Sequence, residues 1–243
     1  MQIDINADVG EGVGNEVDIM PFISSCNIAC GGHAGDLQSM TTVVRLAKKY
    51  KVKIGAHPSF PDKKNFGREI LQMTAADLFS SLRQQIRMFQ NVLHSENELL
   101  HHIKPHGALY NLVAKDEKTA KVLVEVIKSI ELPIKLYAPY DSVIAKVAKF
   151  ENIEVTYEAF ADRNYNADLS LVSRQNKNAL ILKKESVFNH VKHILKTQKV
   201  MVITGEKVSI KASTFCVHGD TKNAVEILKY LHQELSNNQI YIR

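Results

Sequence analysis

The sequence predicts an α/β fold in which parallel strands close into a barrel surrounded by helices. Short β-like runs alternate with amphipathic helical stretches along the 243 residues, and such alternation is typical of a parallel sheet with helices outside it. Roughly seven or eight such units in a chain of this length fit a closed barrel better than an open doubly wound sheet. Because no Gly-, Pro- or Ser-rich linker interrupts the chain, we expect residues 1–243 to form a single barrel domain.

The first half of the chain supplies four expected strands, at residues 2–6, 26–29, 52–56 and 100–104. Asp36 can cap a helix after the second strand, and Thr74 with Asp77 forms a capping box that opens a longer helix after the third. In both helices apolar side chains recur at helical spacing. They are Met40, Val43, Val44 and Ala47 in the first, and Leu78, Leu82, Ile86, Phe89 and Leu93 in the second.

The second half continues the alternation. Strands are expected at 134–137, 154–157, 179–182 and 214–217, and the runs 200–203 and 208–210, which flank Thr204-Gly205, predict a small hairpin. Helices are expected after Asp116, around 187–195 and over 221–235, because apolar residues recur there every three or four positions. These elements complete the predicted barrel.

Charge and composition exclude several classes of protein. The formal net charge is +5, from 31 Lys+Arg against 26 Asp+Glu, and the basic residues are dispersed over predicted helix surfaces. We therefore expect no nucleic-acid partner. Three cysteines cannot form a disulfide framework. The acidic start MQIDINADVGEG predicts no signal peptide, and no apolar run approaches the length of a membrane span, so we expect a soluble cytoplasmic protein without a membrane partner.

Polar residues cluster directly after the predicted strands. In a βα barrel, all of these positions face the rim at the carboxyl ends of the strands, where the active sites of such barrels lie. This placement predicts a functional site independently of any family. The residues are Asp8, Glu11, His33, Asp36, His57, Ser59, Asp62, Arg68, Lys104, His106, Tyr110, Asp162, Arg163, His218 and Asp220.

Several of these residues also have a purely structural interpretation. Asp36 and Asp220 stand where helices are expected to start, so each is first a candidate N-cap. His33 lies among glycine and alanine and can be a turn residue, and His57-Pro58 can be a rigid turn. The remaining histidines fit a structural role better than a catalytic one. We expect His101 and His102 in the core or on the surface, and His94, His190, His193 and His232 on solvated helix faces.

Two familiar motifs are not supported. Cys26 and Cys30 lack closely spaced partner ligands and fit strand packing better than a metal site. The loop DVGEGVG is rich in glycine, but it lacks the Gly-Lys-Ser/Thr ending of a P-loop and carries two carboxylates that would repel phosphate. The loop therefore does not predict a P-loop nucleotide site.

Lys104 is the strongest candidate for chemistry, because it ends an apolar strand two residues before His106. A lysine in a barrel mouth either has its pKa lowered by burial or pairs with carboxylates. His106 is a natural proton shuttle, and Arg163 could bind a substrate carboxylate through two parallel hydrogen bonds.

Taken together, the motifs resemble the LamB/YcsF family. The matching segments cover the chain from the first strand to the last helix in the family's order, and so many segments in register are highly specific. They are IDINADVGEG (3–12), NIACGGHAGD (27–36), IGAHPSFPD (54–62), NFGR (65–68), KPHGALYN (104–111), FADRNY (160–165) and CVHGD (216–220). Three departures concern pocket shape: Gly32 replaces a larger apolar residue, Leu169 a glycine and Ser173 a proline.

The resemblance implies a (β/α)7 TIM-like barrel similar to the polysaccharide deacetylase-type barrels. It also implies a role in an ATP-dependent 5-oxoprolinase made with two partner subunits. Such a complex opens the lactam of 5-oxo-L-proline (pyroglutamate) to L-glutamate while ATP, supplied with Mg²⁺, is hydrolysed to ADP and phosphate.

We assign roles from residue type within this expected reaction. Asp8 or Glu11 would be the base, His106 the acid/base, and Lys104 would neutralise the activated oxygen or phosphate. Arg163 or Arg68 would hold the substrate carboxylate. The remaining candidates would line the substrate site: His33, His57, Tyr110, Asp162, His218 and Asp220.

Two other functions remain open at this point. Asp8, His33, His57 and His218 include ligand types suited to Zn²⁺ or another transition metal, which would indicate a metal-dependent amide hydrolase or deacetylase. Alternatively, the chain could be a non-catalytic subunit that binds 5-oxoproline for an ATP-using partner. Metal analysis addresses the first alternative. The kinetics of site variants address the second, because they would change KM with kcat nearly intact.

Overall fold

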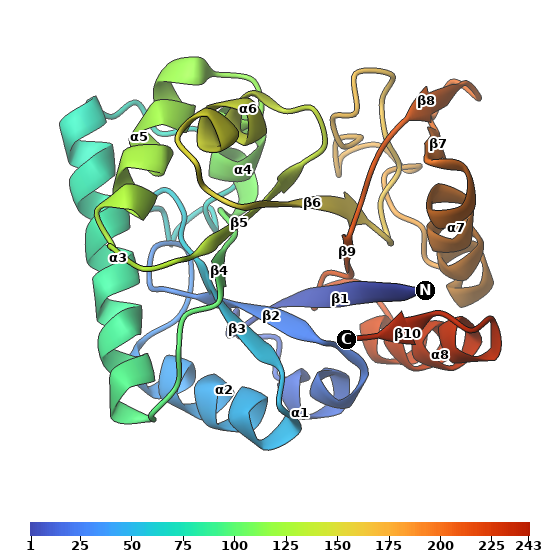
Figure 1. Ribbon diagram of the computed structural model, residues 1–243, viewed down its shortest axis with the longest axis horizontal. Helices are drawn as coiled ribbons and strands as arrows, with labels where there is room; N and C mark the ends of the chain where they lie inside the picture. Colours follow the sequence, from blue (N-terminus) through green and yellow to red (C-terminus); the bar gives the residue numbers. More distant parts are fainter.

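The computed structural model describes all residues 1–243 and contains a closed barrel of seven parallel strands (Figure 1). The order is β1-β2-β3-β4-β5-β6-β9, and β9 pairs back with β1, so the sheet has no free edge within the barrel. The predicted seven-stranded barrel is therefore confirmed. The barrel strands are β1 Gln2–Val9, β2 Ser25–Ala29, β3 Lys53–His57, β4 His102–Ile103, β5 Lys135–Pro139, β6 Val155–Phe160 and β9 Thr214–Cys216.

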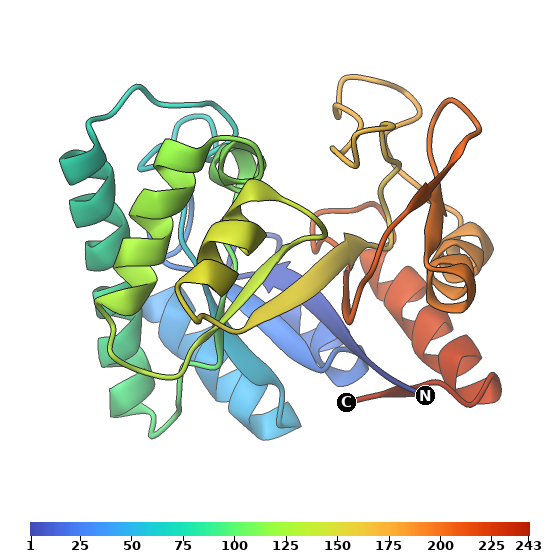
Figure 2. The same cartoon turned by 45° about the horizontal axis from the view of Figure 1, so that its top comes forward.

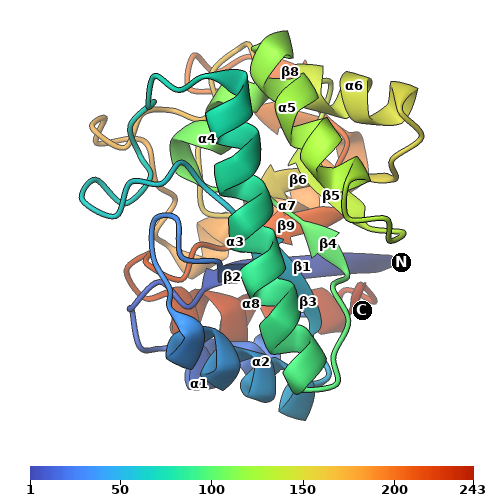
Figure 3. The ribbon, with the colours of Figure 1, turned by 90° about the vertical axis from the view of Figure 1, so that its left-hand side faces the viewer.

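Helices surround the barrel, with α3 and α5 on one side, α1 and α2 below, and α7 and α8 on the opposite side (Figures 1 and 3). None of them is long and apolar enough to cross a membrane. Their bounds are α1 Glu16–Ile19, the 3-10 helix η1 Met20–Phe22, α2 Leu37–Tyr50, α3 Ala75–Ser95, α4 Gly107–Val113, α5 Glu117–Lys128, α6 Val143–Phe150, α7 Lys184–Thr197 and α8 Ala224–Asn237.

The predicted helix caps are present in the structure. The Asp36 carboxylate accepts a hydrogen bond from the Ser39 amide, and the Ser39 hydroxyl in turn accepts one from the Asp36 amide. The Thr74 hydroxyl accepts from the Asp77 amide at the start of α3, and Asp116 caps α5. The apolar faces that follow these caps are buried against the barrel in one continuous core.

Two elements differ from the sequence-based expectation. Residues 179–182 form no strand. Only Leu180 makes an isolated bridge with Arg163, because this segment belongs to an irregular excursion between β6 and α7. A short strand that was not expected, β10 Tyr241–Ile242, pairs parallel with the start of β1. The predicted hairpin is confirmed as β7 Lys199–Met201 and β8 Lys207–Ser209. Figure 2 shows the excursion and the hairpin rising on the same side of the barrel.

The interior of the barrel is unusually polar near its amino-terminal end. Asp4 accepts hydrogen bonds from Ser24 at 2.7 Å, from Ser25 at 2.6 Å and from Thr214 at 2.6 Å. One step further along the axis, the Asn27 amide donates to Asn6, and His102 Nε2 lies 2.8 Å from the Asn27 carbonyl oxygen. Side chains linked by hydrogen bonds therefore fill the barrel up to the level of the candidate site.

A glycine on β3 makes room for the buried His102 ring. A Cβ at Gly55 would collide with the His102 ring, which stacks on Tyr137 with centroids 3.9 Å apart. His102 is therefore a residue of the barrel core, one of the two places that we expected for it.

Candidate active site

A cavity of about 400 Å³ opens at the carboxyl ends of the barrel strands, where the sequence predicted the site. Its volume lies in the lower part of the range of small-molecule sites. Most of the predicted site residues line it: Asp8, Glu11, His57, Arg68, Lys104, His106, Tyr110, Arg163, His218 and Asp220. His33 and Asp162 are buried and do not line it, and neither do Asp36, Ser59 and Asp62.

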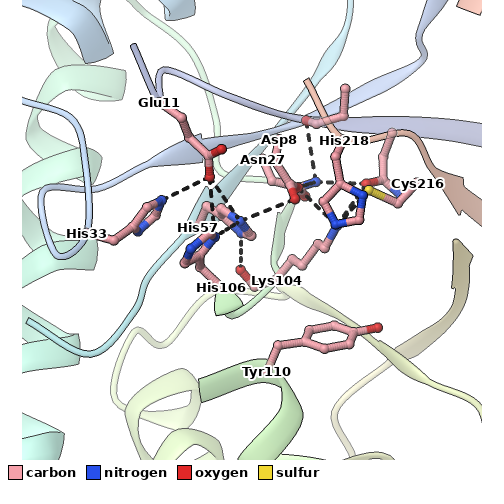
Figure 4. Close-up of polar contacts among 12 residues, drawn as sticks. Asp8, Glu11, Asn27, His33, His57, Lys104, His106, Tyr110, Cys216 and His218 are labelled. Carbon is pink, nitrogen blue, oxygen red and sulfur yellow. Dashed lines mark hydrogen bonds and ion pairs between the residues drawn. The ribbon is translucent and has the colours of Figure 1, made fainter. Parts of the chain in front are cut away.

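Lys104 lies at the floor of the cavity, immediately after β4, and is almost completely buried (Figure 4). Its ammonium is 3.0 Å from Asp8 Oδ1 and 2.9 Å from Glu158 Oε1. Burial alone would lower the pKa of Lys104, but the two carboxylates raise that pKa well above its ordinary value. Of the two possibilities left open for this lysine, the structure therefore shows the ion-paired one. Lys104 is a fixed positive charge and not a base.

Asp8, near the end of β1, lies between the lysine and a group of histidines. Burial alone would raise the pKa of its carboxyl, but the positive charge that His57 carries when protonated and the Lys104 ammonium hold that pKa well below its ordinary value. Its Oδ1 accepts from Asn27 at 2.8 Å, and its Oδ2 lies 3.5 Å from His57 Nε2. Asp8 is therefore ionised at neutral pH and faces the cavity.

Glu158, on β6, is a central residue of the site that we did not predict from the sequence. It accepts hydrogen bonds from Tyr110 at 2.7 Å and from Asn6 at 2.9 Å, besides its ion pair with Lys104. Burial next to this carboxylate raises the pKa of Tyr110 well above its ordinary value, so the phenol stays protonated. Glu158 therefore fixes both Tyr110 and Lys104.

A second group joins Glu11 with three histidines on neighbouring loops (Figure 4). Glu11 Oε1 is 3.0 Å from His33 Nε2, 3.3 Å from His106 Nδ1 and 3.7 Å from His57 Nε2. The His33 and His106 rings stack with centroids 3.6 Å apart. Glu11 and the three histidines, which lie far apart along the chain, are thus in contact in the folded protein.

Burial controls the protonation of this group. It lowers the pKa of His57 to about 3 and also lowers that of His33, so both rings are neutral at pH 7. Burial would raise the pKa of Glu11, but hydrogen bonds from His106 and His33 lower it well below its ordinary value. Glu11 is therefore an ionised carboxylate beside the neutral rings of His33 and His57.

Asp162 acts on the cavity indirectly, through His218. It is fully buried and accepts hydrogen bonds from the His218 amide at 3.1 Å and from the His218 ring Nδ1 at 3.0 Å. The His218 ring also stacks on Phe160, with centroids 5.1 Å apart. Because Nδ1 faces a carboxylate and carries the proton, the ring presents the lone pair of Nε2 on its other side.

Arginines and one aspartate surround the mouth of the cavity. Asp220 accepts from Arg68 at 2.7 Å and from Arg174 at 3.0 Å. Arg163 is different, because its guanidinium donates to the backbone carbonyls of Val172 and Ala179. Arg68 and Arg174 are thus the arginines at the mouth whose charge pairs with a surface carboxylate, whereas Arg163 supports the excursion after β6.

Some sequence-based interpretations of polar residues are wrong. Asp220 does not cap α8, which begins after Asn223, because it pairs with the arginines at the cavity mouth. His190 and His193 are not solvated: both are partly buried, and their Nε2 atoms lack hydrogen-bond partners. Cys26 and Cys30 are buried free thiols in the core, in keeping with the strand-packing interpretation.

The departures at Gly32 and Leu169 have visible structural counterparts. A Cβ at Gly32 would collide with Gln85 and Ser59, and the Gln85 amide donates to the Ser59 carbonyl at 2.9 Å. Gln85 thus fills space that a larger residue at position 32 would need. Leu169 has φ 64°, a left-handed conformation that glycine adopts without strain, which accounts for a glycine being expected there.

Two groups of side chains could hold a metal ion, and they divide the set predicted from the sequence. Glu11, His33, His57 and His106 form one group, and Asp8, Cys216 and His218 form the other. The predicted set of Asp8, His33, His57 and His218 takes two members from each. In the second group, the Lys104 ammonium already lies 3.0 Å from Asp8 and 3.1 Å from the Cys216 sulfur.

Comparison with known proteins shows which family this chain belongs to. The model of the LamB/YcsF family matches residues 3–243. A protein of Haemophilus influenzae (strain PittEE) that is named as a 5-oxoprolinase subunit is 38% identical over 241 residues, which cover 99% of this chain and 98% of that protein. A protein of Pyrococcus horikoshii with the same name is 37% identical over 247 residues, covering 100% of this chain and 97% of the relative.

Solved structures agree with the sequence comparison. The crystal structure of a lactam utilization protein from Thermus thermophilus superimposes with a TM-score of 0.92 at 31% identity, over 100% of this chain and 99% of that one. A family 4 carbohydrate esterase from Streptomyces lividans shares the fold alone, with a TM-score of 0.50 at 8% identity over 99% of this chain and 91% of that one.

Proposed function

Because the chain belongs to the LamB/YcsF family, we propose that it is the barrel subunit of an ATP-dependent 5-oxoprolinase. In this proposal it acts in the cytoplasm with two partner subunits, opens the lactam of 5-oxo-L-proline to L-glutamate, and couples the opening to hydrolysis of Mg²⁺-bound ATP. The observation that supports the substrate most strongly is the 38% identity, over nearly the whole length, to a protein named as a 5-oxoprolinase subunit.

The chemistry explains why ATP is needed. A five-membered lactam is unstrained and stable, so its hydrolysis at neutral pH requires coupling. Transfer of the γ-phosphoryl group to the amide oxygen makes the ring carbon electrophilic and releases ADP. One water then adds to that carbon, the C–N bond breaks as the nitrogen takes a proton, and a second water cleaves the resulting acyl phosphate to glutamate and phosphate. The site must therefore supply a base, an acid and positive charge.

The cavity offers each of these groups. Asp8, which is ionised and faces the cavity, is the first candidate for the base that takes the proton of the attacking water, and Glu11 is the second. His106 lies on the cavity wall and is suited to return a proton to the leaving nitrogen. The fixed charge of Lys104 is placed to neutralise the activated oxygen or its phosphate.

Arg68 and Arg174 are better suited to bind the substrate carboxylate than Arg163. The guanidinium of Arg163 is engaged by two backbone carbonyls, whereas Arg68 and Arg174 share the Asp220 carboxylate at the cavity mouth. An incoming carboxylate can replace or share that partner with a similar charge and geometry. His33, His57, Tyr110, Asp162 and His218 then shape or support the cavity around the ring.

A drop-out assay tests this proposal. The purified chain, its two partner subunits, ATP, Mg²⁺ and 5-oxo-L-proline are mixed, and glutamate and phosphate are measured with each component omitted. We expect glutamate only when this chain and ATP are both present. Glutamate formed at the same rate without this chain, or no glutamate with all components present, would contradict the proposal.

The same assay distinguishes the two remaining alternatives. Glutamate formed by this chain and a transition metal without ATP would indicate a metal-dependent amide hydrolase, an alternative that the histidine group keeps open. If Asp8→Asn raises KM and leaves kcat nearly unchanged, the chain binds substrate for the complex without taking part in catalysis.

A further inference from the structure

We propose that Glu11, His33, His57 and His106 form a binding site for one divalent transition-metal ion, with His57 Nε2 and His106 Nδ1 as its central ligands. The inference comes from the hydrogen-bonding pattern of the rings and does not depend on the proposed function. The group that it assigns differs from the set expected from the sequence, because Glu11 and His106 replace Asp8 and His218.

Backbone carbonyls fix the tautomers of the two central histidines. His57 Nδ1 lies 2.7 Å from the Lys104 carbonyl oxygen, and His106 Nε2 lies 2.9 Å from the Phe66 carbonyl oxygen. A carbonyl oxygen can only accept, so each of these nitrogens carries the ring proton. The other nitrogen of each ring, His57 Nε2 and His106 Nδ1, is therefore the one that faces the group.

These two nitrogens face each other at 3.0 Å. Glu11 Oε1 faces the same point, 3.3 Å from His106 Nδ1 and 3.7 Å from His57 Nε2. Two ring nitrogens and a carboxylate oxygen thus converge on one point, where either a shared proton or a metal ion can hold them together. Donation of the outer N–H to a backbone carbonyl is also the usual way in which a metal-binding histidine is oriented.

The spacing suits a tetrahedral ion. Bonds of about 2.0–2.1 Å to a central zinc place neighbouring ligand atoms roughly 3.3 Å apart. Four of the six separations range from 3.0 to 3.7 Å, all lie within 4.8 Å, and His33 Nε2 lies 3.0 Å from Glu11 Oε1 as the fourth ligand atom. The buried Nδ1 of His33 has no partner and its ring is stacked on that of His106, so His33 becomes the fourth ligand when its ring turns and its proton moves from Nε2 to Nδ1. Three imidazoles and one carboxylate fit Zn²⁺ or a similar ion.

The loop of residues 65–68 (NFGR) packs directly against the histidines of this group. Gly67 has φ 61°, and a Cβ there would lie 2.9 Å from the His33 Cβ and 3.1 Å from the His106 ring. This close approach brings the Phe66 carbonyl to His106. Glu11, His57 and His106 also line the cavity, so an ion can enter from it.

The second group of ligand types is a poorer candidate. The Lys104 ammonium lies 3.0 Å from Asp8 and 3.1 Å from the Cys216 sulfur, and a metal ion there would meet this fixed positive charge. Metal titration of variants in each group can therefore distinguish the two candidate sites.

Metal binding by the full chain tests the proposal without any activity measurement. The purified protein is treated with EDTA, dialysed, and titrated with Zn²⁺ by calorimetry and with Co²⁺ by visible absorption, which reports tetrahedral coordination. We expect one ion per chain and a tetrahedral Co²⁺ band. Glu11→Gln, which keeps the side-chain size, and His106→Gln should each weaken binding by about 100-fold or more, with folding checked by circular dichroism.

Two matched variants serve as controls. His218→Asn removes a ligand of the second group, and His94→Ala removes an exposed histidine, so both should bind the ion as the unchanged chain does. The proposal is wrong if no stoichiometric ion binds, which would mean that a shared proton occupies the place between the rings. It is also wrong if His218→Asn weakens binding as much as Glu11→Gln does.

Discussion

The two ends of the barrel interior are both filled with polar side chains, but they use them differently. At the amino-terminal end, the Asp4 carboxylate accepts from four hydroxyl groups, those of Ser24, Ser25, Tyr137 and Thr214. At the carboxyl end, two histidine nitrogens and a carboxylate face one another, and the buried Nδ1 of His33 has no partner. One network is saturated by its own side chains, and the other is not.

This difference indicates that the amino-terminal end of the barrel interior serves stability and that the carboxyl end serves function. Buried polar groups are normally satisfied, because each unsatisfied group costs free energy of folding. The Asp4 network follows this rule and stabilises the closed barrel. The histidine group departs from it at the rim where barrel active sites lie, which is where stability is most often given up for function. Variants at the carboxyl end should therefore lower activity, whereas variants at the amino-terminal end should lower stability and leave activity nearly unchanged.

The largest effect is expected at Lys104, which belongs to the site and also balances buried charge. Lys104→Met leaves Asp8 and Glu158 without their cation, so we expect kcat to fall by a factor of about 10² or more and the free energy of unfolding to fall by about 3 kcal/mol. The drop-out assay and urea unfolding measure the two quantities. Activity close to that of the unchanged chain would remove Lys104 from the mechanism.

His106→Ala should affect the rate as strongly and the stability less. We expect kcat to fall by a factor of about 10², because the proton donor for the leaving nitrogen is lost. A fall in activity that external imidazole restores would support the proton-transfer role. An unchanged kcat would assign His106 to structure alone.

Asp4→Ala should have the opposite pattern at the other end of the barrel. Four hydroxyl groups lose their shared acceptor, so we expect the free energy of unfolding to fall by about 3 kcal/mol while kcat of the folded protein changes less than about threefold. Urea unfolding and the drop-out assay check this together. Loss of activity in a variant that remains folded would erase the contrast between the two ends.

Acid should destabilise the protein mainly through the carboxyl end. His57 has a pKa of about 3 when folded, against about 6.5 when unfolded, so the unfolded chain takes up a proton first as the pH falls below 6.5. Stability is then lost between pH 6.5 and 3, by about 2 kcal/mol from pH 7 to pH 5 for this group alone. Asp8 and Glu11, whose pKa values are lowered, add a further loss below about pH 4.5. Urea midpoints at pH 7, 6 and 5 should fall, and His57→Asn should flatten this dependence.

The smallest effect is expected at the cavity mouth. Arg68→Gln removes one of the two arginines beside Asp220, so we expect KM for 5-oxo-L-proline to rise about five- to tenfold with kcat nearly unchanged. Asp220→Asn is the matched control, because it frees both arginines and should not raise KM. A rise of similar size in the control would mean that Asp220 itself contacts the substrate.

Much of the barrel could be predicted from local patterns. Apolar periodicity and helix caps placed most of the strands and helices. Several short elements were missed, including α4, α6 and β10. Each is too short to show a recognisable periodicity of apolar residues in the sequence. The segment 179–182 has the composition of a strand, yet it forms one bridge only, since its place in the fold offers no neighbouring strand beyond Arg163.

Most residues of the site could be predicted from their positions after the strands. The residue that was missed is one whose contacts are with residues far away along the chain. The polar residues after the strands do gather around the cavity, because parallel strands end at one rim. Glu158 was not predicted, since its partners Asn6 and Tyr110 lie 152 and 48 positions away along the chain. A usable signal was present in β1, where Asp4, Asn6 and Asp8 alternate with apolar residues and so point to one face.

The fit between Gly55 and the His102 ring has a consequence for how this sequence can change. Because any side chain at 55 would occupy the space of that ring, neither position can vary alone without a collision or a void. Gly55→Ala should be tolerated only together with a smaller residue at 102, and His102→Ala alone should leave a hole beneath the site. The two positions are therefore expected to evolve as a pair, so that a substitution at one creates the opportunity for a substitution at the other.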